Sequence, residues 1–156
     1  MITSDKHPKY PDKTVYEVKA ESRDPDEQAE VRMGKLFSVN GNQVHFTRGV
    51  GEVDLKLNDV PTDVKHPRSA RIKSAVLGSK SQGAWVIIDG TTARLTAADV
   101  RSGLAEFETE AARHPGPSRG IRKVLVVIQS GLTLIEHDRD LGTGTSIYWT
   151  GHRLKM

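Results

Sequence analysis

Two short runs of apolar, largely β-branched residues constrain the fold most strongly, namely Ala84 to Ile88 and Val124 to Ile128. Continuous apolar runs of this length are typical of strands that are buried on both faces. Between them, Thr96 to about Arg113 has helical periodicity and begins with a capping Thr. Buried strands that alternate with helices predict an α/β domain in which helices flank a sheet.

The rest of the chain is expected to add short strands and two further helices. Asp24-Pro25-Asp26-Glu27 is a typical helix start, because a capping Asp is followed by Pro and by acids in the first turn. That helix should end near Val39, and another should run from Ser69 to near Gly83. We expect the core sheet to contain Gln43 to Thr47, Glu52 to Leu57, Pro61 to Lys65, Ala84 to Ile88 and Arg122 to Gln129, with Leu132 to Glu136 as a hairpin partner.

Length and composition limit the possible classes of protein. The chain has 156 residues, the size of one domain, and no cysteine, which excludes a disulfide scaffold, a thiol nucleophile and a thiolate zinc site. Its apolar runs are far shorter than the roughly 18 residues of a membrane helix, and no basic-then-apolar leader opens the sequence. We expect no membrane segment, an N-terminal arm over residues 1–24, a domain over 25–137 and a C-terminal tail over 138–156.

Charge is distributed unevenly along the chain. Residues 25–65 carry five basic and seven acidic side chains, net −2, whereas residues 66–156 carry thirteen basic and eight acidic ones, net +5. A metal-dependent nuclease requires such an acidic segment within a basic chain, because carboxylates hold the cation while basic side chains hold the phosphates around it.

The most informative group of polar residues is Asp54, Asp63 and Lys65. The two acids are nine positions apart, with Asn58-Asp59 at or near the bend of a predicted hairpin, so they can approach each other on adjacent strands. Lys65 shares a face with Asp63 because strand side chains alternate. Two carboxylates can hold a hard divalent cation while the lysine orients or deprotonates a water, which suits phosphodiester hydrolysis. The alternative is an ordinary solvated hairpin.

A basic segment follows this hairpin and provides candidate substrate contacts. Basic side chains and free backbone N–H groups at a helix start both favour phosphate. The alternative for each residue is a solvated surface position. The candidates are His66, Arg68, Arg71 and Lys73.

The order and spacing of these segments resemble a known family. Asp54 to Lys65, the helix from Ser69, Gln82 to Asp89, Leu95-Thr96 and Val124 to Ile128 together look like the C-terminal tRNA-nuclease domain of contact-dependent growth-inhibition toxins and related polymorphic toxins, within the PD-(D/E)xK nuclease superfamily. The resemblance covers roughly residues 25–137. It implies a PD-(D/E)xK-like mixed sheet, a divalent cation (Mg²⁺, Mn²⁺ or Zn²⁺), a tRNA substrate, a cognate immunity protein and delivery, within a larger secreted toxin, into the cytoplasm of a target cell.

That family supplies one more metal-facing acid, a glutamate on the helix before the first core strand. Glu27 and Glu30 are the candidates, and Glu30 is preferred because it shares a helix face with Met33 and Phe37. The alternative is that both acids only decorate the first turn of the helix.

Glu17-Val18-Lys19 also matches the D/E-x-K tripeptide. We expect it to be a bystander, because only Asp5 and Asp12 lie upstream of it, in a proline-broken arm without a spaced acid in a hairpin. Within this arm, Thr14 to Lys19 alternates well enough for an edge strand. Two other functions remain open: a DNA endonuclease of the same superfamily, and a non-catalytic binding or immunity-type protein with a degenerate site.

Overall fold

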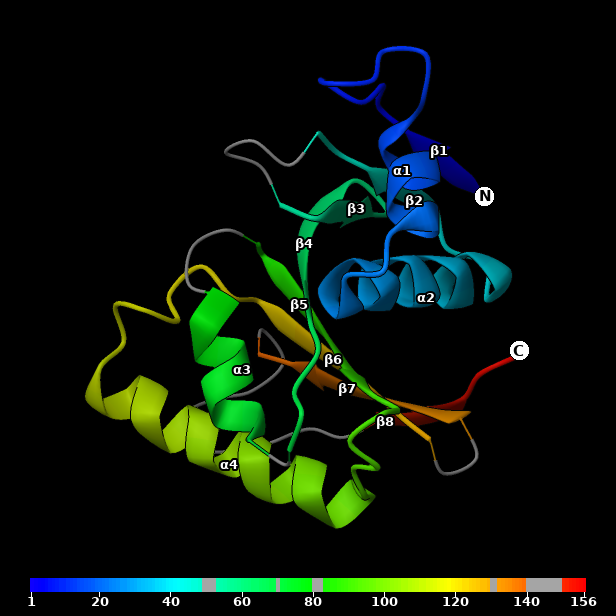
Figure 1. Ribbon diagram of the computed structural model, residues 1–156. Coiled ribbons are helices and arrows are strands. Elements are labelled where there is room, and N and C mark those ends of the chain that lie inside the picture. Colours follow the sequence, from blue (N-terminus) through cyan, green and yellow to red (C-terminus); the bar gives the residue numbers. More distant parts are fainter. Residues whose placement is uncertain (49–52, 70, 80–82, 130–131, 140–149) are drawn as a thin grey trace.

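The computed structural model describes residues 1–48, 53–69, 71–79, 83–129, 132–139 and 150–156. In this part of the chain, eight strands form one mixed sheet and four helices pack against it (Figure 1). The strands are β1 (Ile2–Ser4), β2 (Val44–Phe46), β3 (Leu55–Leu57), β4 (Val60–Lys65), β5 (Trp85–Gly90), β6 (Lys123–Ile128), β7 (Thr133–Asp138) and β8 (Thr150–Arg153). The helices are α1 (Val15–Glu21), α2 (Pro25–Val39), α3 (Ile72–Ser79) and α4 (Ala97–Arg113).

The strands lie in the sheet in the order in which they occur in the sequence. β4, β5 and β6 are parallel and are connected through α3 and α4, whereas the pairs β2–β3, β3–β4, β6–β7 and β7–β8 are antiparallel. β1 pairs parallel to β2. The prediction of a mixed sheet flanked by helices in a single α/β domain is therefore confirmed, as are the three helices that the periodicity indicated.

Helices cover both faces of the central strands, with α3 and α4 on one face and α2 on the other (Figure 1). Along β5, Val86 packs with Leu104 and Phe107 beneath α4, whereas the next residue, Ile87, packs with Met33 beneath α2. Each side chain of the run therefore finds an apolar layer whichever way it points, which explains why the strand is apolar without alternation.

Helix α2 is held at its start by its cap and along its length by close packing. The Asp24 carboxylate accepts a hydrogen bond from the backbone N–H of Asp26 at 2.8 Å, and Pro25 is the first helical residue. A Cβ added to Gly34 would lie only 2.7 Å from Cζ of Phe46, so the helix backbone lies directly on β2. This close contact fixes the height of α2 above the sheet.

The predicted hairpin between β3 and β4 is present, with its bend at Asn58-Asp59. Both residues have positive φ, 51° and 67°, as a two-residue type I′ turn requires. The first strand is shorter than the predicted Glu52 to Leu57, and Glu52 lies outside the described residues.

The N-terminal 24 residues are built differently from the prediction. The expected edge strand over Thr14 to Lys19 is wrong: Thr14 instead caps α1 by accepting a hydrogen bond from the backbone N–H of Glu17 at 3.1 Å. This Thr-x-x-Glu spacing is a helix-start pattern, and it prevails over the apparent alternation. The strand of this segment is β1, which pairs with β2.

The C-terminal segment contributes β8 to the sheet edge beside β7. Beyond it, Lys155 donates its backbone N–H to Asn40 Oδ1 at 2.8 Å, which ties the chain end to the end of α2. Both terminal segments thus join the sheet formed by residues 25–137. The division into an arm, a domain over 25–137 and a tail stays a prediction. No helix among the described residues is long and apolar enough to cross a membrane.

Candidate functional site

The β3–β4 hairpin brings Asp54 and Asp63 together. Its ladder pairs Leu57 with Val60 and Leu55 with Thr62, so the same register places Asp54 opposite Asp63 just beyond the last pair. Beyond that pair, a side chain replaces the backbone as the hydrogen-bond acceptor: Oδ2 of Asp54 accepts a hydrogen bond from the backbone N–H of Val64 at 2.9 Å. Asp54 is thereby oriented beside β4.

Asp63 is a buried acid with an unsatisfied oxygen. Its side chain is 2% exposed, and its Oδ2 has no hydrogen-bond partner. Burial and then the neighbouring negative charge of Asp54 raise the pKa of Asp63 to about 6, against the opposing influence of Lys65. Lys65 Nζ lies 3.9 Å from that oxygen, two residues further along the same strand face. At this distance the two groups form an ion pair but no hydrogen bond.

Glu30 reaches the same place from α2. It is buried, and burial, a side-chain hydrogen bond with Asp54 and the charge of Asp54 raise the pKa of Glu30 to about 8. The structure therefore brings Glu30, Asp54, Asp63 and Lys65 together, with Asp54 in the middle. Glu27, the other candidate glutamate, lies one helical turn earlier on α2 and is only half-buried.

Sequence reasoning missed one cation of this cluster. Lys19 of α1 lies against Glu30, with 3.1 Å between Nζ and Oε2, and the two side chains are only 14% and 9% exposed. Lys19, which was expected to be a bystander, therefore contacts a candidate site residue. The signal that could have found it is the Thr14 capping pattern, because a helix from Val15 turns Lys19 toward α2, whereas an edge strand does not.

The chemistry of these donors suits a hard divalent cation, although they are not grouped around one point. In the described part of the chain, no three His, Cys, Asp or Glu side chains are arranged so that they could hold a metal ion together. The carboxyl groups instead contact one another in pairs through Asp54. However, the buried, unpartnered Oδ2 of Asp63 and the accumulated carboxyl groups are what a hard cation with oxygen ligands would satisfy.

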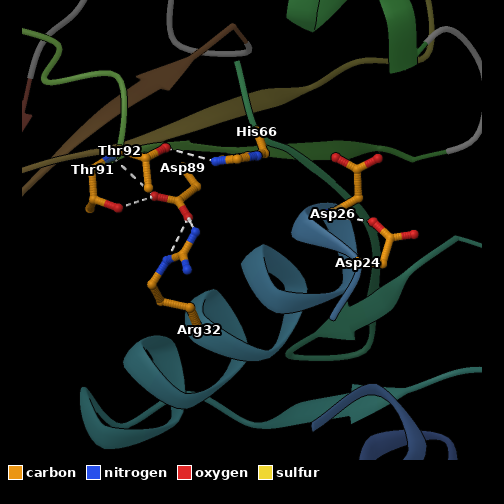
Figure 2. Close-up of polar contacts among 7 residues, drawn as sticks. All are labelled: Asp24, Asp26, Arg32, His66, Asp89, Thr91 and Thr92. Carbon is orange, nitrogen blue, oxygen red and sulfur yellow. Dashed lines mark hydrogen bonds and ion pairs between the residues drawn. The ribbon is translucent and has the colours of Figure 1, made fainter. Parts of the chain in front are cut away.

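The four candidate substrate contacts lie in different surroundings. His66 follows β4 directly, and its Nε2 is 2.7 Å from Oγ1 of Thr92 (Figure 2). Arg68 and Arg71 are exposed before α3. Lys73 lines a surface hollow together with Glu106 and Glu110 of α4. The structure therefore does not bring Lys73 to the cluster of Glu30, Asp54 and Asp63.

A second buried acid, Asp89, lies at the end of β5, and all of its contacts are satisfied. Its Oδ2 accepts hydrogen bonds from Nε and Nη2 of Arg32 at 2.8 and 2.5 Å, and its Oδ1 accepts the backbone N–H and hydroxyl of Thr91 at 3.1 and 2.6 Å. Figure 2 shows Arg32 reaching it from α2, beside the contact between His66 and Thr92. This cluster ties α2 to the turn after β5.

The fold defines a class of protein, a mixed α/β domain with an acidic cluster at a hairpin beside its parallel strands. No protein-family model matches the sequence, and no curated protein matches it. Among solved structures, the chain resembles one from the CdiA-CT/CdiI toxin and immunity complex of Burkholderia pseudomallei, with 15% identity, a TM-score of 0.50 and coverage of 72% of this chain and 84% of that one. At this identity the likeness is one of fold.

Proposed function

We propose that the protein is a divalent-metal-dependent endoribonuclease, a tRNA-cleaving domain of an interbacterial toxin with a PD-(D/E)xK-type site. The observation that carries this proposal is the buried, unpartnered oxygen of Asp63 beside Asp54, Glu30 and Lys65. Nothing in an apolar core requires three contacting carboxyl groups, because each loses hydration and repels the others. A site that has to hold a cation explains this cost.

Glu30, Asp54 and Asp63 would hold the cation. When bound, a divalent cation polarises a phosphate and lowers the pKa of water. Asp54 is already oriented by the Val64 N–H, and Asp63 offers its free oxygen. Lys65, with its ammonium close to Asp63, is suited to orient the attacking water by donating a hydrogen bond to it. To help deprotonate that water it would have to act as the neutral amine, which can accept the proton.

The residues that follow the hairpin along the chain are suited to binding a polyanion. His66, Arg68 and Arg71 lie along the chain between β4 and α3, and the two arginines are exposed. Such side chains position the phosphates of a nucleic acid without reading its bases. The choice of tRNA rests on the resemblance to toxin nucleases and on the fold likeness to a chain of a toxin–immunity complex.

A toxin of this kind implies a cognate immunity protein that blocks it in the producing cell. It also implies delivery into the cytoplasm of a target cell as part of a larger secreted protein. Both proposals have the same support as the toxin assignment, namely the likeness to a chain of a complex that contains a toxin and an immunity protein.

The second candidate is a non-catalytic, immunity-type protein. Two observations favour it: the solved complex contains both kinds of chain, and the described residues hold no ready three-ligand metal group. In that case the acidic cluster would bind a basic protein surface, and no hydrolysis would follow.

One experiment separates these functions. The protein is incubated with total tRNA or with duplex DNA in Mg²⁺, Mn²⁺ or Zn²⁺, with and without chelator, and the products are resolved on denaturing gels. We expect discrete tRNA fragments that require metal, and intact DNA. Cleavage of DNA instead would identify a DNA endonuclease.

The matched variants are Asp63→Asn and Asp59→Asn. Both remove one carboxylate from the same hairpin, but Asp59 is an exposed turn residue whose positive φ Asn tolerates. Asp63→Asn should abolish cleavage while Asp59→Asn retains it. If neither nucleic acid is cut with any of the three metals, the nuclease proposal fails and the immunity-type role gains support.

A further inference from the structure

The ion pair between Lys19 and Glu30 is buried, unlike another pair of the same N-terminal segment. Lys13 and Glu21 lie 3.5 Å apart with side chains 44% and 71% exposed, whereas Lys19 and Glu30 lie 3.1 Å apart at 14% and 9%. An exposed pair is screened by water and contributes little. A buried pair costs desolvation of both ions and persists only where geometry repays that cost.

The geometry at Glu30 explains what the buried pair achieves. Lys19 contacts one carboxylate oxygen, Oε2, while the Glu30 side chain is also hydrogen-bonded to Asp54. Glu30 is therefore held between a cation from α1 and a carboxyl group from the hairpin. Without the lysine, Glu30 would be held only by its hydrogen bond to Asp54, and when Glu30 ionises the two carboxylates would repel each other and Glu30 would be free to turn away.

Lys19 is itself placed by the sheet. β1 pairs with β2, the Asp5 backbone N–H bonds to Phe46 O at 2.9 Å, and Val15 N–H bonds to Asp5 O at 2.9 Å at the start of α1. Tyr16 then packs on Phe46, with ring centroids 5.1 Å apart. The N-terminal segment is thus docked on the same strand against which α2 packs, so the position of Lys19 relative to Glu30 is fixed from both sides.

We propose that Lys19 is a positioning residue of the carboxylate site, which holds one oxygen of Glu30 and so keeps the Glu30 carboxyl group against Asp54, next to the cation that Asp54 and Asp63 would share. This inference rests on the proposed metal-dependent function. Carboxylates that bind metals are commonly held by such an outer hydrogen-bonding partner, whose loss weakens metal binding about 10–100-fold. On this view α1 is part of the working site.

The test is Mn²⁺ binding to the full chain, measured by titration calorimetry for the wild type, Lys19→Met, Lys19→Arg and the control Lys13→Met. We expect the affinity of Lys19→Met to fall about 10–100-fold. Lys19→Arg should restore most of the loss because it keeps a cationic donor, and Lys13→Met should bind like the wild type. Circular dichroism and unfolding curves establish that each variant is folded, and Lys19→Gln replaces Lys19→Met if the latter does not fold.

A double variant separates positioning from general packing. If Lys19 acts through Glu30, adding Lys19→Met to Glu30→Gln should weaken Mn²⁺ binding no further than Glu30→Gln alone. Equal affinity of Lys19→Met and the wild type, or additive losses in the double variant, would overturn the inference. Failure of the proposed function looks different: the wild type would then bind no Mn²⁺, or its binding would survive Asp63→Asn, and the inference would fall with it.

Discussion

Asp63 and Asp89 lie on neighbouring parallel strands and are both fully or almost fully buried, yet their surroundings differ completely. Asp89 accepts four hydrogen bonds, two of them from the guanidinium of Arg32. Asp63 has an oxygen with no partner, a second carboxyl group opposite it and a lysine too distant for a hydrogen bond. A satisfied buried acid stabilises a fold, whereas an unsatisfied one weakens it and is retained for another reason.

The largest effect should come from breaking the satisfied cluster. Asp89→Ala leaves Arg32 and Thr91 without their acceptor, and we expect the free energy of unfolding to fall by roughly 3 kcal/mol, the lower end for a broken buried pair because Arg32 keeps contact with water. Denaturant unfolding followed by circular dichroism measures this loss. Asp63→Ala is the matched control and should change stability by less than about 1 kcal/mol. Equal losses in both variants would remove the distinction between the two acids.

Removing the unsatisfied acid should instead affect the proposed chemistry. We expect Asp63→Ala and Asp54→Ala to lower the rate of tRNA cleavage roughly a hundredfold or more, about 2.7 kcal/mol of barrier, because a metal ligand and its charge are both lost. Initial rates at saturating metal provide the measurement, and near-native circular dichroism is the control. Wild-type rates in either folded variant would show that the chemistry lies elsewhere.

A smaller effect, on pH dependence, sharpens the same comparison. The pKa of Glu30 is raised to about 8, so between about pH 4.5 and 8 this group is protonated in the folded chain and ionised in the unfolded one. The folded state then binds more protons, and the stability of the metal-free protein should fall as pH rises through this range. Asp63, with its pKa raised to about 6, acts in the same direction at lower pH.

Glu30→Gln should flatten this pH dependence, since glutamine carries no titrating proton. Glu27→Gln, one helical turn earlier, serves as the control and should leave the slope unchanged. Urea midpoints at several pH values in the presence of chelator measure both. A slope that survives Glu30→Gln above about pH 6, beyond the range of Asp63, would mean that another group binds the extra proton.

The acids of the hairpin could be predicted from the sequence because their relation is local. Asn58-Asp59 defines the turn, the turn sets the register, and the register places Asp54 opposite Asp63. Glu30 required one further step, since its shared face with Met33 and Phe37 indicated which way it points, and both of these neighbours are buried.

The contacts that could not be predicted join segments far apart in sequence. Arg32 and Asp89 are 57 residues apart, and no local pattern links a helix face to the end of a particular strand. Lys19 was missed for a different reason: the alternation of Thr14 to Lys19 was interpreted as an edge strand, and the Thr14 cap that begins α1 was overlooked. The position of Lys73 could not be predicted either, because packing sets the rotation of α3 that turns this side chain toward α4.

The smallest expected effect concerns the exposed arginines that extend from the unsatisfied acid toward α3. If Arg71 contacts a substrate phosphate, Arg71→Ala in an Asp63→Asn background, which prevents cleavage, should lower the slope of log affinity against log salt for RNA by about one unit. Arg113→Ala is a suitable control, because Arg113 is equally exposed at the end of α4. Arg139 is not, since its guanidinium is bonded to Glu108 and to two carbonyl oxygens. A slope altered by Arg113→Ala and unchanged by Arg71→Ala would place the nucleic acid at the C-terminal end of α4 rather than beside Arg71. The cluster around Asp63 would then need a different explanation from substrate hydrolysis.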